Sequence, residues 1–126
     1  MARRAYAAFN RGDLEGMLAD FAPDSEYVTT GAIPGVEEVY RGPEGFRRFL
    51  KSFWGEFDEP GLEVHELIEA EDQVLVGLTF QGRGKQSGVE TTWDLWHLWT
   101  VRAGKVARGQ AFTSREQAVE AAGLQE

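Results

Sequence analysis

Hydrophobic residues recur at helical spacing in two stretches of the first half of the chain. Tyr6 and Phe9 fall near one face of a first helix, and the apolar positions 14, 17, 18 and 21 continue the pattern after a break at residues 10–13. Asp13 precedes this second piece and is placed to cap it. Behind Pro43, apolar residues repeat with the period of a helix whose aromatic face is broad: Phe46, Phe49, Leu50, Phe53, Trp54 and Phe57.

The rest of the chain shows the period of two that is typical of strands. Pro23 and Asp24 predict a turn before a short strand at residues 26–30, and a loop rich in Gly and Pro spans 31–42. Longer strands are predicted at 62–70, 73–82, 90–102 and 105–112. Ser114 and Gln117 form a capping box for a last helix, which Gly123 ends. Helices followed by an antiparallel meander indicate the α+β class, in one domain over residues 1–126.

The pair Ala103-Gly104 allows the two faces of the sheet to be predicted. A two-residue hairpin there pairs Arg102 with Lys105, and the register of both strands follows. Because faces alternate along a strand, one predicted face collects mostly aromatic and aliphatic residues with three polar ones. Its members are Trp93, Leu95, His97, Trp99, Val101, Val106, Arg108, Gln110 and Phe112. A slip of one residue in the register would exchange the faces.

Three polar groups among apolar walls are typical of a ligand pocket. The structural alternative is that Arg108 pairs with a carboxylate, for which Glu26 is the candidate, and that His97 is a satisfied core residue. The opposite face would expose Trp96 and Leu98 beside a stripe of small residues. Exposed apolar patches commonly mark interfaces, so we expect a homodimer through this outer face.

Composition narrows the classes of function. The 126 residues carry a net charge of −8, which disfavours binding to nucleic acid and to anionic membranes. The chain lacks cysteine, and no apolar stretch resembles a signal peptide or a membrane span. We expect a cytoplasmic protein. With two histidines and no convincing ligand spacing, we also expect no metal site and no cofactor.

Several short segments, in order, resemble the SnoaL-like branch of the NTF2-like superfamily. They are residues 9–14 (FNRGDL), 23–24 (PD), 40–45 (YRGPEG), 82–84 (GRG), 87–88 (SG), 97–106 (HLWTVRAGKV), 115–118 (REQA) and 121–124 (AAGL). The resemblance implies a cone-shaped α+β barrel, with N-terminal helices on a curved sheet around a deep pocket, often dimeric through the outer sheet face. Relatives include polyketide cyclases and ketosteroid isomerases, as well as members with no known reaction.

The well-understood enzymes of this family resemble one another in using a pocket Asp, often with Tyr or Arg. This chain departs from that pattern, because Asp94 falls on the predicted outer face and Ser114 stands where relatives often carry Asp. We therefore expect a protein that binds a small apolar or aromatic molecule. The alternative is a lyase or isomerase with His97 as general base and Arg108 as its electrophilic partner. The expected ligand-binding residues are Tyr27, Trp54, Phe57, Trp93, Trp99, Gln110 and Phe112.

Overall fold

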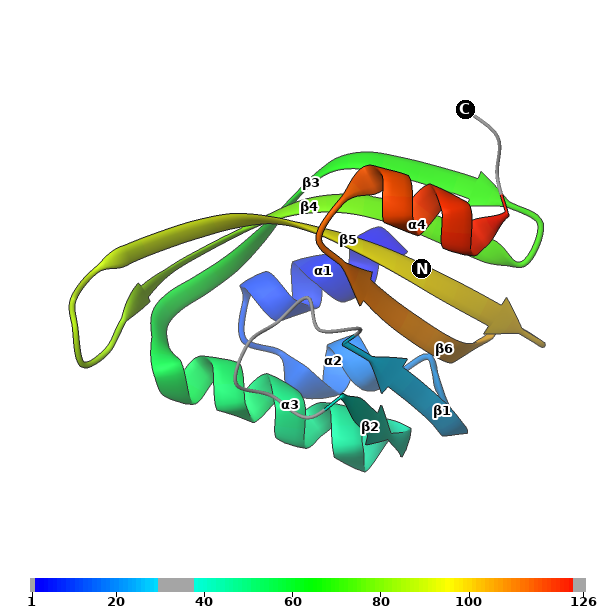
Figure 1. The fold of residues 1–126 in the computed structure, drawn as a ribbon. Coiled ribbons are helices and arrows are strands. Elements are labelled where there is room, and N and C mark those ends of the chain that lie inside the picture. The colour runs from blue at the N-terminus through cyan, green and yellow to red at the C-terminus, as the bar shows by residue number, and fades with distance from the viewer. Residues whose placement is uncertain (1, 30–37, 124–126) are drawn as a thin grey trace.

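The computed structural model contains one curved sheet of six strands in the order β2-β1-β6-β5-β4-β3 (Figure 1). It describes residues 2–29 and 38–123, apart from the side chains of Phe53 and Trp54. Part of the predicted 31–42 loop therefore lies outside the described residues. All neighbouring strands are antiparallel except β1 and β6, which run parallel. The strands are β1 (Phe21–Val28), β2 (Val39–Arg41), β3 (Phe57–Ala70), β4 (Gln73–Gly84), β5 (Glu90–Arg102) and β6 (Lys105–Phe112).

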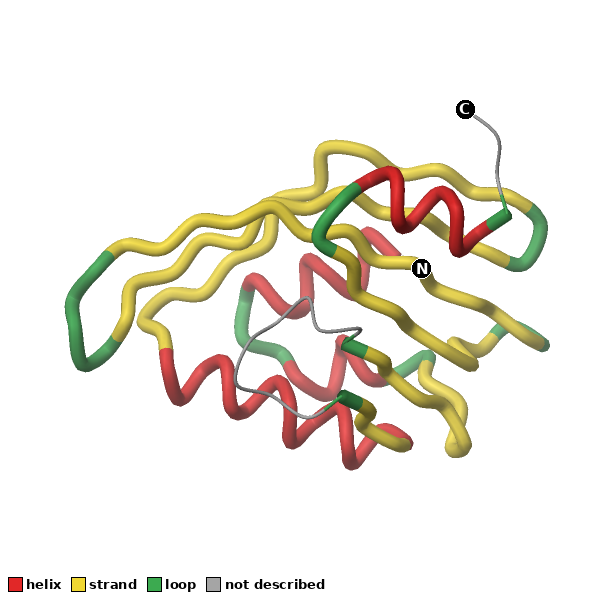
Figure 2. Tube along the Cα trace, in the orientation of Figure 1, coloured by secondary structure: helices red, strands yellow, loops and turns green. Residues whose placement is uncertain are grey.

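Three helices pack on the inner side of the sheet, and a fourth covers its outer face (Figures 1 and 2). The inner helices are α1 (Ala2–Asn10), α2 (Leu14–Leu18) and α3 (Gly42–Glu56), and the outer one is α4 (Arg115–Ala122). The Asp13 carboxylate caps α2 by accepting from Gly16 N at 2.9 Å, and the Ser114 hydroxyl caps α4 by accepting from Gln117 N at 3.2 Å. The predicted α+β class and short C-terminal helix are confirmed.

Three predicted boundaries are wrong because sheet pairing overrides local pattern. Phe21, which continues the helical period of α2, begins β1 and pairs with Val106 of β6. Pro23 lies within β1, where the pairing with β6 is interrupted between Phe21 and Glu26. An interrupted pairing tolerates proline, which donates no backbone hydrogen bond. Phe57 leaves the helical pattern and opens β3.

The predicted hairpin forms, but its register is wrong beyond the second pair. Ala103 and Gly104 both have positive φ, 52° and 76°, as a type I′ turn requires. Arg102 then pairs with Lys105 and Val101 with Val106, after which Thr100 pairs with Arg108. Ala107 is thus the extra residue of a β-bulge, which reverses the facing of the remaining β6 side chains.

The outer face carries a small second core instead of an exposed patch. Leu98 is 1 % exposed and packs with Leu75 against Ala118 and Val119 of α4. Trp96 is half-buried beside this cluster and lies over Gly77. The predicted exposure of Leu98 is therefore wrong, so Leu98 no longer supports a dimer through this face.

Candidate functional site

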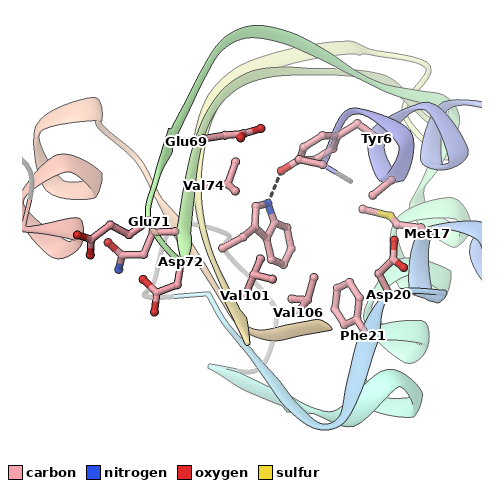
Figure 3. Close-up of a pocket in the computed structure, with 14 residues that line it drawn as sticks. Tyr6, Met17, Asp20, Phe21, Glu69, Glu71, Asp72, Val74, Val101 and Val106 are labelled. Carbon is pink, nitrogen blue, oxygen red and sulfur yellow. Dashed lines mark hydrogen bonds between the residues drawn. The ribbon is translucent and has the colours of Figure 1, made fainter. Parts of the chain in front are cut away.

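A cavity of about 330 Å³ lies at one end of the barrel, between α1, the start of β1 and the ends of β3 to β6. Its walls are mostly apolar, and aromatic rings come from three separate elements. Figure 3 shows Tyr6, Phe21, Val74, Val101 and Val106 arranged around it. The other lining residues are Ala2, Ala5, Met17, Asp20, Glu69, Glu71, Asp72, Gln73 and Trp99.

A buried hydrogen-bond chain forms one wall of the cavity and continues into the core. Trp99 Nε1–H donates to the Tyr6 hydroxyl at 2.7 Å, the dashed line in Figure 3. The Tyr6 hydroxyl is 2.7 Å from His97 Nδ1, and the Tyr27 hydroxyl is 2.9 Å from His97 Nε2. Since a neutral imidazole carries one proton, one tyrosine donates to the ring and the other accepts from it.

Burial keeps His97, Tyr6 and Tyr27 of this hydrogen-bond network uncharged. His97 is 4 % exposed, and loss of solvation lowers its pKa to about 3. Burial likewise raises the pKa of the Tyr6 and Tyr27 hydroxyls well above their usual value. The network therefore satisfies buried polar atoms without placing a charge in the core.

Gly109 explains how the Trp99 ring reaches its position. Trp99 pairs directly with Gly109 on the neighbouring strand, and its indole covers the glycine. A Cβ at position 109 would lie 2.2 Å from Trp99 Cζ3 and 3.0 Å from Tyr27 Cδ1. Only glycine leaves room for both rings, so Gly109 allows Trp99 to lie where it lines the cavity.

The predicted site residues divide into three groups. Trp99 lines the 330 Å³ cavity, together with Val101 and Val106 of the same predicted face. Tyr27, Trp93 and His97 instead surround a hollow of only about 30 Å³ under α3. Phe57 packs against the rings of Phe80 and Trp93, at centroid distances of 5.1 and 6.1 Å. The side chain of Trp54 lies outside the described residues.

Arg108, Gln110 and Phe112 form the third group, and the Ala107 bulge turns them to the outer face. Phe112 packs with the outer core beneath α4. Arg108 Nε lies 3.3 Å from Glu26 Oε1, the ion pair that the sequence offered as a structural alternative. The placement of these three residues beside His97 and Trp99 is therefore wrong.

The sequence did not single out Tyr6, Phe21 or Val74 as site residues. Helical periodicity places Tyr6 only on an apolar helix face, and it assigns Phe21 to the wrong element. One signal was available, because a buried tyrosine usually needs a hydrogen-bond partner. A tyrosine on the core face of α1 therefore pointed to polar groups across from it.

The described residues also bear on a metal site, on a membrane-spanning helix and on the position of Asp94. Within residues 2–29 and 38–123, no three His, Asp or Glu side chains gather where they could hold a metal ion. No helix in those ranges is long and apolar enough to cross a membrane. Asp94 lies outside the cavity, exposed, where its carboxylate accepts from the Thr79 hydroxyl at 3.0 Å.

The fold is that of a cone-shaped NTF2-like barrel. The chain belongs to the SnoaL-like domain family, whose model matches residues 2–109. No curated protein sequence matches it.

Solved structures resemble the chain over nearly its full length. TerC, co-crystallised with polyporic acid, is 29% identical, with 94% of this chain and 92% of that one covered and a TM-score of 0.78. An NTF2-like protein from Burkholderia thailandensis is 27% identical, with 94% and 93% covered and a TM-score of 0.81. A Catenulispora acidiphila protein with a ketosteroid isomerase-like fold, in complex with trimethylamine, is 16% identical, with 98% and 92% covered and a TM-score of 0.79. At that identity the last likeness shows the fold alone.

Proposed function

We propose that this protein binds a small, mainly apolar molecule in the cavity beside Tyr6, Val74 and Trp99. One observation carries the proposal: a cavity of about 330 Å³ with aromatic and aliphatic walls. Small-molecule sites typically measure roughly 300–1,000 Å³ and combine apolar walls with a few polar groups. Here the Tyr6–Trp99 hydrogen bond is the polar feature of the wall.

The geometry favours binding over a reaction with His97 as general base. Both ring nitrogens of His97 lie within hydrogen-bond distance of tyrosine hydroxyls, and its pKa is lowered to about 3 by burial. A general base works best when its pKa is near the operating pH and it reaches the substrate proton directly. In addition, Arg108, the electrophilic partner in that alternative, lies on the outer face.

The comparisons support a ligand-binding role without naming the ligand. TerC, 29% identical to this chain, was crystallised with polyporic acid. That molecule is a property of TerC, and we carry over only the idea that this barrel accommodates a compact organic molecule.

The test is to fill the cavity. Val74 lies on the inner face, directly opposite Trp99, so Val74→Phe places a ring in the space that the ligand needs. Val89, 59 % exposed and absent from the cavity lining, is the matched control because Val89→Phe adds the same ring at a surface position. The probe is 2-naphthol, an uncharged two-ring aromatic, and binding is measured by isothermal titration calorimetry.

We expect 2-naphthol to bind the wild type and Val89→Phe alike, and Val74→Phe at least tenfold more weakly. Circular dichroism and thermal unfolding establish that both variants fold. Equal affinity in all three proteins would mean that the probe binds elsewhere, and would refute the proposal. The proposal is also refuted if neither 2-naphthol nor other aromatics of its size bind the wild type. The homodimer, the cytoplasmic location, the single domain and the absence of a cofactor stay predictions from the sequence.

A further inference from the structure

The charged side chains that line the cavity are all acidic. Its lining includes Asp20, Glu69, Glu71 and Asp72, and no Lys, Arg or His side chain lines it among the described residues. Arg4 pairs with Asp20 from α1, but the Arg4 side chain is 67% exposed. The edge of the cavity is therefore negative even after this pair is counted.

Glu69 is the carboxylate that the fold directs over the cavity. It pairs with Val74 on β4, which in turn pairs with Trp99 on β5, so the three side chains share the inner face. In Figure 3 the Glu69 side chain extends toward Tyr6, whereas Glu71 and Asp72 point away from the ring of lining residues. Glu69 forms no ion pair with any described residue, which leaves its charge available to a ligand.

Aromatic rings line the same space. Trp99, Phe21 and Tyr6 line the cavity, and Phe21 meets Trp99 edge-on at 5.8 Å between ring centroids. The face of an aromatic ring attracts a cation, most strongly for tryptophan. A cation in the cavity would thus be attracted both by the Glu69 carboxylate and by the aromatic rings. A carboxylate on the ligand would instead be repelled by Glu69.

We infer that the cavity selects an organic cation, an amine or quaternary ammonium group on a compact apolar body, with Glu69 facing the charge. This inference rests on the proposed function, because it assigns a ligand class to the same cavity. It also goes beyond that function, since an apolar cavity alone does not distinguish between ligand charges.

The experiment compares three probes of similar shape at low ionic strength: benzyltrimethylammonium, its uncharged isostere neopentylbenzene, and phenylacetate. Binding is followed by the shift of the Trp99 indole N–H signal in NMR spectra, assigned with Trp99→Phe. The variants are Glu69→Gln and the control Glu120→Gln, which removes the same charge from an exposed position on α4, outside the cavity lining.

We expect the wild type to bind the cation at least about tenfold more tightly than the anion, since the two differ in the sign of their interaction with every carboxylate at the edge. Glu69→Gln should weaken cation binding about three- to fivefold, the scale of one solvent-exposed charge pair. It should leave the uncharged isostere unaffected, and Glu120→Gln should change cation binding by less than about twofold. Salt at 0.5 M should reduce the preference for the cation by screening.

Each contrary result has a distinct meaning. If the uncharged isostere binds but the cation and anion bind equally, the cation inference is overturned while the proposed function stands. Equal losses in Glu69→Gln and Glu120→Gln overturn the role of Glu69. If none of the three probes shifts the Trp99 signal, the inference and the proposed function fall together.

Discussion

Lowering the pH from 7.5 to 5 should destabilise the wild-type protein more than the variant His97→Gln. In the folded protein burial lowers the pKa of His97 from 6.5 to about 3. The unfolded chain therefore takes up a proton at this residue between pH 7.5 and 5, and the folded chain does not. Stability that is fully present above pH 6.5 is lost as the pH falls toward 3.

The size of the effect follows from these two pKa values. Between pH 7.5 and 5, proton uptake by the unfolded state lowers the free energy of unfolding by about 2 kcal/mol. Other groups contribute equally to the wild type and to His97→Gln, so the difference between the two proteins isolates His97. The matched control is His65→Gln, which removes the other histidine from an exposed position.

The assay is urea denaturation of all three proteins at several pH values. The free energy of unfolding should fall about 2 kcal/mol further in the wild type and His65→Gln than in His97→Gln. If His97→Gln folds too poorly for this comparison, the NMR chemical shift of His97 Cε1–H in the wild type reports its titration directly. A midpoint above pH 5, or equal pH dependence in the three proteins, would refute the buried neutral imidazole.

Further substitutions test the packing of the site and the cap of α4 by urea denaturation. Tyr6→Phe should cost about 2–5 kcal/mol, roughly twice the cost of Tyr27→Phe, because it leaves two buried nitrogens without a partner and Tyr27→Phe leaves one. Gly109→Ala should cost about 3 kcal/mol, since its Cβ would collide with Trp99 Cζ3, whereas Gly55→Ala in open space on α3 should stabilise by about 0.5–1 kcal/mol. Ser114→Ala should cost about 1 kcal/mol by removing the cap of α4.

Each of these predictions has an outcome that contradicts it. Equal costs for the two tyrosine variants would mean that the Trp99–Tyr6 bond contributes nothing. A neutral Gly109→Ala would show that Trp99 does not lie against this strand. An unchanged free energy of unfolding in Ser114→Ala would show that the Ser114 cap does not stabilise α4.

The fold was predictable from the sequence because its periodicities are strong and local. The aromatic repeat from Phe46 marked α3, and the Ala103-Gly104 pair marked the hairpin. The faces of β6 were not predictable, since the Ala107 bulge depends on how β6 joins both β5 and β1. That single extra residue moved Arg108 out of the predicted site.

The candidate site was predictable only in part, because it is formed by elements that lie far apart in the sequence. The sequence places Trp99 correctly on the inner face, because faces alternate along β5 from Val101, whose pairing with Val106 the turn fixes. It did not find Tyr6 or Phe21, whose approach to Trp99 depends on how α1 and β1 pack on the sheet. The cover that α4 gives Leu98 likewise comes from tertiary packing, which no local pattern encodes.

The most direct test of ligand binding is a crystal structure of the wild-type protein soaked with 2-naphthol. We expect electron density for the aromatic ring system between Tyr6, Val74 and Trp99, with the Tyr6–Trp99 hydrogen bond retained. Density for the probe only at another site, or side chains that close the cavity so that no ring fits, would contradict the proposed function.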